Sequence, residues 1–143
     1  MGVTAIPETV HDNHIRIAGQ LAVAEDPGRV VRALRDRAGF TQEALAALLR
    51  IRRESLSRIE GGKVAPSTGL IQRLASLMTL TQAVREHLAE CEARGLRPDE
   101  LYLQRLAVAL RLPRDVADEA LLASMMAYEH KKRGLLKVLE EKA

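Results

Sequence analysis

Apolar residues recur three or four positions apart along most of the chain, which is the spacing of helices that bury one face. The pattern predicts helices over residues 14–24, 27–38, 98–111 and 113 to about 133, two short helices within 41–62, and a helix from residue 67. Residues 81–94 are a further helix, or the same helix continued after a kink. The pattern shows no convincing strand and no internal repeat, so we expect an all-α fold.

Residues with special backbone roles mark where the helices begin and end. Asp26 is a good N-cap, Pro27 suits the first helical position, and Gly39 stops that helix. Gly134 is expected to interrupt the last helix ahead of a short tail. Residues 1–12 have no helical period, and we expect a flexible arm there. In the helix over 14–24 the candidates for burial are Ile15, Ile17, Leu21 and Val23.

Residues 41–66 are the most informative part of the chain. They read TQEALAALLRIRRESLSRIEGGKVAP and predict a helix, a tight turn and a second helix. Thr41 is a good N-cap, which leaves the first N–H groups of its helix to point at a phosphate. The buried stripes of the two helices are formed by Leu45, Ala46, Leu49, Ile51, Leu56 and Ile59. The second helix turns a basic face outward, which indicates a reader of the DNA major groove.

This stretch resembles the helix-turn-helix of the Xre/Cro phage-repressor family. The resemblance covers about residues 27–78, and residues 17–19 and 25–28 are similar to the lead-in of archaeal regulators of this family. It implies a lambda-repressor-like helix-turn-helix domain with an appended helical C-terminal region. The residues that carry it are Leu34, Arg35, Thr41, Gln42, Leu45, Ala46, Ser57, Arg58, Ile59, Glu60, Gly62, Lys63 and Pro66.

The chain departs from the family pattern in and beside the turn between the two short helices. Arg50 stands where the family usually has glycine, and Arg52 replaces the usual small N-cap of the second helix. A residue other than glycine at positive φ costs roughly 1 kcal/mol. The fold tolerates such a cost, but the departure bears on the angle of the second helix.

The positive charge is concentrated on the motif. The chain has a net charge of +3, whereas residues 28–63 alone carry eight arginines and one lysine against four acidic residues. A basic segment on an otherwise balanced chain is the electrostatic footprint expected of a phosphate-binding surface. An arginine-rich helix face is more often plain solvated surface, and the helix-turn-helix context favours the DNA-binding interpretation here.

The resemblance implies separate roles for two sets of residues. Residues expected to contact bases are Arg53, Glu54, Ser57 and Arg58; an arginine suits guanine, and Glu54 suits the amino group of cytosine. Residues expected to contact phosphate are Thr41, Gln42, Arg35, Arg37, Arg52 and Lys63. The implied function is sequence-specific binding of double-stranded DNA in transcription regulation.

The helices beyond the motif predict a homodimer. A single reading helix offers too few contacts for tight specific binding, and this class of protein pairs on two half-sites. Small alanines alternate with bulky residues over 115–128, which allows two helices to approach closely. The expected interface residues are Leu121, Leu122, Met125 and Tyr128.

The chain carries no sequence signal for catalysis, a metal or a cofactor. It has no glycine-rich phosphate loop, and its histidines do not pair with cysteine at ligand spacing. The single cysteine, Cys91, favours a reducing compartment, and no apolar run reaches the roughly 20 residues of a membrane span. We therefore expect a cytoplasmic protein that is not an enzyme.

The expected organisation is an arm over 1–12, a DNA-binding domain over 13–80 and a dimerisation region over 81–143. Two alternative functions stay open. One is an antitoxin that regulates its own operon while its extra helices inhibit a partner toxin. The other is a transcriptional coactivator that uses the module as a scaffold for another protein.

Overall fold

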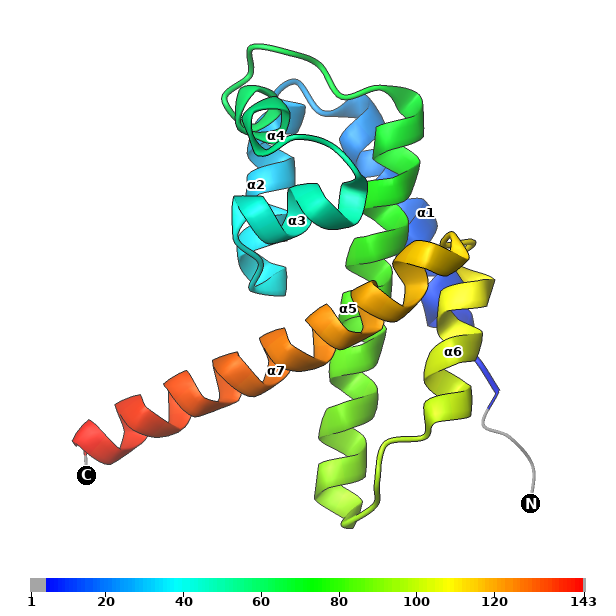
Figure 1. Cartoon of the computed structure of the whole chain (residues 1–143), viewed down its shortest axis with the longest axis vertical. Coiled ribbons are helices and arrows are strands. Elements are labelled where there is room, and N and C mark those ends of the chain that lie inside the picture. The colour runs from blue at the N-terminus through cyan, green and yellow to red at the C-terminus, as the bar shows by residue number, and fades with distance from the viewer. Residues whose placement is uncertain (1–4, 143) are drawn as a thin grey trace.

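The computed structural model describes residues 5–142, which form seven α-helices and no strand, so the all-α prediction is confirmed (Figure 1). The helices are α1 (Glu8–Val23), α2 (Pro27–Ala38), α3 (Gln42–Leu49), α4 (Arg53–Glu60), α5 (Thr68–Arg94), α6 (Glu100–Ala109) and α7 (Arg114–Lys142).

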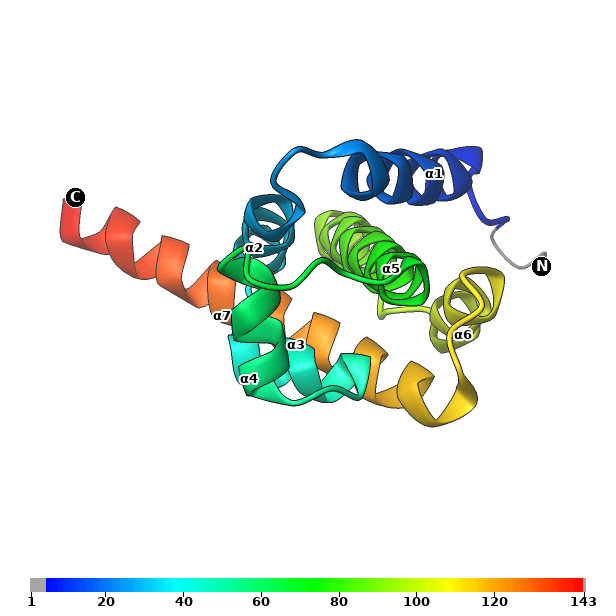
Figure 2. The ribbon, with the colours of Figure 1, turned by 90° about the horizontal axis from the view of Figure 1, so that it is seen from above.

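Helix α5 is the centre of the fold. Figure 2 shows it almost end-on, with α1, α2, α6 and α7 around it. Leu74, Leu80 and Val84 on this helix are completely buried, because neighbours cover it on several sides. Helix α4 lies outside this arrangement and packs on α2 and α3.

The sequence analysis allowed either a kink or a new helix near residue 81. Helix α5 runs through this position without interruption. It also crosses the predicted boundary at residue 80. The buried Thr81 hydroxyl donates to the carbonyl of Leu77 at 2.9 Å, one turn earlier, so the helix itself satisfies this polar group. The hydroxyl of Ser124 in α7 lies 3.1 Å from that of Thr81 and joins the two helices.

The predicted helix boundaries around the motif are confirmed. Asp26 and Thr41 accept hydrogen bonds from the backbone N–H groups of Arg29 and Ala44, as N-caps do. Gly39 follows α2 with φ of 85°, the left-handed conformation that ends helices. Local signals within a few residues are sufficient to define these ends.

The start of the chain differs from the prediction. Residues 8–12, expected in a flexible arm, belong to α1, and Val10 is buried; residues 1–4 of that arm lie outside the described residues. Ile15 and Val23, expected to be buried, are 72% and 82% exposed. Only one face of α1 packs against the body, and these two side chains lie off that face.

The predicted break at Gly134 is wrong. Helix α7 continues through it to Lys142, because a single glycine costs a helix only about 1 kcal/mol. Residues 134–142 project away from the other helices, and each of them is exposed (Figure 1). We call this segment the free end of α7.

Candidate nucleic-acid interface

Helices α3 and α4 are joined by a tight turn at Arg50. Its backbone has φ of 58° and ψ of 40°, the left-handed conformation that the sequence indicated for this position. Behind the turn Leu45, Leu49 and Leu56 are completely buried. The apolar stripe predicted for the two helices is therefore confirmed, with Ile51 only half-buried at the turn.

The outward side of α4 is polar and free. Arg53, Glu54, Ser57 and Arg58 are all exposed, and within residues 5–142 their side chains form no hydrogen bond or ion pair. They lie on one face of a helix of eight residues, which we call the α4 face. A partner can approach this face without first breaking contacts inside the chain.

A part-buried ion pair fixes α4 from behind. The Arg35 guanidinium in α2 donates from Nε to Glu60 Oε2 at 2.8 Å and from its terminal nitrogen to Oε1 at 3.0 Å. The two side chains are only 12% and 4% exposed. The hydrogen bond to Glu60 raises the pKa of Arg35, so the guanidinium stays charged. This two-point contact sets how the end of α4 lies against α2.

Two of the predicted phosphate contacts take part in this internal network. Arg35 also donates to the carbonyl of Phe40 at 3.0 Å, so three of its N–H groups are used inside the chain. Gln42 donates through Nε2 to Glu60 Oε1 at 3.0 Å. The structure therefore uses Arg35 to position α4, which differs from the predicted contact to phosphate. The sequence did not reveal this role, because Glu60 is 25 residues away.

Gly28 allows α2 to reach the backbone of α4. A Cβ atom at this position would lie 2.1 Å from the carbonyl oxygen of Ile59 and 2.9 Å from that of Glu60. Both distances are far inside van der Waals contact. Only glycine permits this approach, which fixes the same end of α4 as the Arg35–Glu60 pair.

Three of the other predicted phosphate contacts are exposed near α3 and α4, and the fourth, Arg37, lies elsewhere. Arg52 and Lys63 are exposed on either side of α4, and Thr41 is exposed at the start of α3. Arg37 lies at the opposite end of α2 from Gly28, roughly 14 Å away at the rise of a helix. Arg37 is thus remote from the end of α4 that Gly28 contacts.

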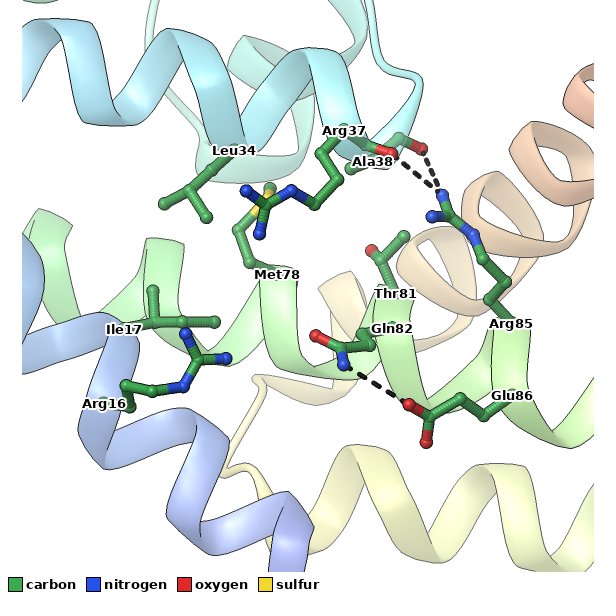
Figure 3. Close-up of a pocket in the computed structure, with 10 residues that line it drawn as sticks. All are labelled: Arg16, Ile17, Leu34, Arg37, Ala38, Met78, Thr81, Gln82, Arg85 and Glu86. Carbon is green, nitrogen blue, oxygen red and sulfur yellow. Dashed lines mark hydrogen bonds between the residues drawn. The ribbon is translucent and has the colours of Figure 1, made fainter.

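Arg37 lines a pocket of about 330 Å³ between α1, α2 and α5. Figure 3 shows its guanidinium in this pocket with that of Arg16, while Arg85 donates to the carbonyls of Arg37 and Ala38. Lys131 from α7 also donates to the Arg37 carbonyl. Burial, then the charges of Arg85 and Arg37, lower the pKa of Lys131. These cations stabilise the carbonyl end of the α2 dipole.

Arg50 has a role that the sequence did not indicate. Its side chain donates to Glu119 Oε2 at 3.0 Å and to the carbonyl oxygen of Asp115 at 3.2 Å, both in the first turns of α7. The hydrogen bond to Glu119 raises the pKa of Arg50. An arginine at this left-handed position thus connects the turn to α7, which glycine could not do.

The four predicted dimer residues are divided between the inside and the outside of the chain. Leu121 is 9% exposed and packs in the chain's own core, whereas Leu122 is 59% exposed. Met125 and Tyr128 are half-buried, and the Tyr128 hydroxyl donates to Glu92 Oε2 at 2.8 Å. Leu121 is therefore not available to a partner. Exposed apolar residues that the prediction did not include lie on the free end of α7: Leu135, Leu136, Val138 and Leu139.

Residues 5–142 contain no group of three or more histidine, cysteine, aspartate or glutamate side chains placed to hold a metal ion. None of the described helices is long and apolar enough to cross a membrane.

Comparison with known protein families gives a match over residues 28–88 to a family described as "Helix-turn-helix domain". The match spans less than half of the chain and runs from the start of α2 into the second half of α5. Neither the curated proteins nor the solved structures contain a significant match. The geometry of α3 and α4 and this match together identify residues 28–88 as a helix-turn-helix domain, a class of domain that binds DNA.

Proposed function

We propose that this protein regulates transcription by binding specific double-stranded DNA as a homodimer, in the manner of Xre/Cro regulators. The observation that carries the proposal is the α4 face. Four polar side chains there have no partner in the described chain, on a helix whose other side is held by a buried ion pair. A helix that reads base edges needs a free polar face and a fixed orientation.

The chemistry of the α4 face suits the major groove. Arg53 and Arg58 can each donate two hydrogen bonds to O6 and N7 of guanine. Glu54 can accept from N4 of cytosine and repels a misplaced phosphate, and Ser57 can donate or accept. The face therefore favours sites that contain G·C pairs.

Phosphate contacts are proposed from the groups that flank the α4 face. Arg52 and Lys63 supply charge on its two sides, and the N-terminus of α3 at Thr41 supplies backbone N–H groups and the positive end of a dipole. The Gln42 amide gives one N–H to Glu60, and its second N–H is available for a phosphate oxygen.

Homodimerisation is proposed through the free end of α7. Four apolar side chains are exposed there along nine residues. The charged residues of this segment, Lys137, Glu140, Glu141 and Lys142, cancel, so two copies do not repel each other. Pairing at this helix would join two reading helices, and two half-sites give far higher affinity than one.

The proposal is tested by selecting bound sequences from a random DNA pool and titrating salt on the selected site. Arg53→Ala and Arg58→Ala should each weaken binding to that site by roughly 1 to 3 kcal/mol and leave binding to scrambled DNA almost unchanged. Lys63→Ala is the matched control, because loss of a phosphate contact should weaken both DNAs alike and lower the salt slope by about one charge. The ratio to compare is the affinity for the selected site divided by the affinity for scrambled DNA. If both arginine variants keep the parent's value of this ratio, α4 does not read bases.

A further inference from the structure

A large groove lies beside α1, with no residue of α4 in its lining. It is bounded by α1, the first turns of α5 and the segment 109–113 that joins α6 to α7, and it has a volume of about 780 Å³. This volume is within the range of small-molecule sites and more than twice that of the pocket in Figure 3. Its apolar lining includes Ile15, Ala18, Ile71, Leu110 and Leu112. The exposed Ile15, which does not pack in the core, is one of the residues that line this groove.

The charged groups of the groove are all basic. His11, His14, Arg73 and Arg111 line it, and none of the described residues that line it is an aspartate or glutamate, although the chain has 19 acidic residues. Burial lowers the pKa of His14, and the charges of His11 and Arg111 lower it further. These basic side chains thus line the groove with no carboxylate among them. We call this site the basic groove.

Arg111 follows the end of α6 in the left-handed backbone conformation. Its φ is 58°, and it is one of two residues other than glycine with positive φ in residues 5–142; the other is Arg50 at the helix-turn-helix turn. The backbone N–H groups of Arg111 and Leu112 donate to the carbonyls of Val108 and Ala107 at 3.0 and 3.1 Å, as at a common type of helix end. The turn fixes Arg111 where segment 109–113 borders the groove.

The basic groove is connected to the helix-turn-helix turn from two sides. Arg73 lines the groove and donates to the carbonyl of Leu49, the last residue of α3, at 2.7 Å. Segment 109–113 leads directly into the first two turns of α7, where Asp115 and Glu119 hold Arg50. A ligand that moves either wall would act on the turn that orients α4.

We propose that the basic groove binds a small organic anion, a molecule with an apolar body and one carboxylate or similar oxyanion, and that this ligand regulates DNA binding. Arg111 supplies the charge that holds the oxyanion, the ring N–H groups of His11 and His14 can donate hydrogen bonds to it, and the aliphatic lining holds the apolar body. The regulatory part rests on the proposed function, while the binding part stands without it.

The binding part is tested on the full chain with anilinonaphthalene sulfonate, a fluorescent anion with an apolar body. We expect saturable binding of one probe per chain, displaced by hexanoate and not by hexanol, which has the same length and no charge. Arg111→Asn should weaken probe affinity about tenfold or more, because it removes a charge-assisted hydrogen bond, and asparagine tolerates positive φ. His14→Gln, which leaves that backbone unchanged, should weaken it as well.

Two control variants separate the basic groove from other surfaces. Arg105→Asn removes an exposed cation from α6 outside the groove and should leave the probe affinity unchanged. Leu135→Gln with Leu139→Gln changes the free end of α7 and should also leave it unchanged. The proposal is overturned if hexanol displaces the probe as well as hexanoate, or if folded Arg111→Asn and His14→Gln both keep the parent affinity.

The regulatory part is tested by measuring affinity for the selected DNA site with and without saturating probe. We expect a change of about threefold or more in the parent chain, the low end of allosteric couplings, and none in Arg111→Asn. An unchanged DNA affinity at full probe occupancy overturns the regulatory part and leaves the binding part intact. If the parent chain selects no DNA sequence, the proposed function fails, and the fluorescence measurements still decide whether the groove binds an anion.

Discussion

Helix α4 and the free end of α7 both expose most of their side chains, but in opposite ways. The exposed residues of α4 are polar, and the helix is held through Leu56, Ile59 and the bonds to Glu60. The exposed residues of the free end include four large apolar ones, and within the described chain no side-chain hydrogen bond reaches this end.

This contrast separates two kinds of surface. A polar face on a fixed helix is suited to a partner read through hydrogen bonds, because its geometry is set before binding. An apolar face on a projecting helix is suited to a partner that supplies the missing burial.

Glu60→Ala should have the largest effect on stability. It leaves the part-buried Arg35 guanidinium with only the exposed Asp36 carboxylate nearby, and we expect a loss of about 3 kcal/mol in the free energy of unfolding. Glu54→Ala, on the exposed side of the same helix, is the matched control and should change stability by less than about 0.5 kcal/mol. Urea unfolding of the two variants measures this difference. Equal stabilities would mean that the buried pair does not hold α4.

Gly28→Ala should destabilise the chain by about 2 kcal/mol, because the added methyl group meets the carbonyls of Ile59 and Glu60 and must push α4 outward. Gly19→Ala is the control. It lies within α1 with open space around its Cβ position, so it should stabilise the chain by about 0.5 to 1 kcal/mol. Thermal unfolding measured by circular dichroism compares them. A stabilising Gly28→Ala would contradict the close approach of α2 and α4.

Leu135→Glu combined with Leu139→Glu should change the free energy of unfolding of the monomer by less than about 0.5 kcal/mol, since these side chains are exposed. The same pair should abolish dimerisation, because it places like charges where two apolar faces meet. Light scattering at micromolar concentration should give twice the monomer mass for the parent and one monomer mass for the variant. A parent that is a monomer both free and on DNA would contradict the proposed dimer.

The smallest effect concerns pH and His14, which belongs to neither helix. Its pKa lies below 6.5 in the folded chain, so near that pH the unfolded chain binds more protons. The free energy of unfolding should therefore fall as the pH drops through 6.5, until the folded chain is also protonated. His14→Gln should flatten this dependence between about pH 7.5 and pH 5.5. If the slope were unchanged in His14→Gln, the burial of His14 would not contribute to it.

The sequence by itself determined the all-α fold, the ends of the helices around the motif and the position of the motif. Asp26, Thr41 and Gly39 act on backbone groups within a few residues, so their effect is visible in a short window of sequence. The stripe through Leu45 and Leu56 was equally visible, because helical spacing alone places these residues on one side.

Only the tertiary structure decided what each charged or exposed residue does. Arg35 and Arg53 are both arginines on basic helices, yet one is buried against Glu60 and the other is free. Arg50 finds its partners 65 and 69 residues away in α7. Ion pairs, burial of Leu121 and the lining of the basic groove depend on how helices meet in space. The spacing of residues along the chain does not predict these contacts, because each contact joins segments that are far apart in the sequence.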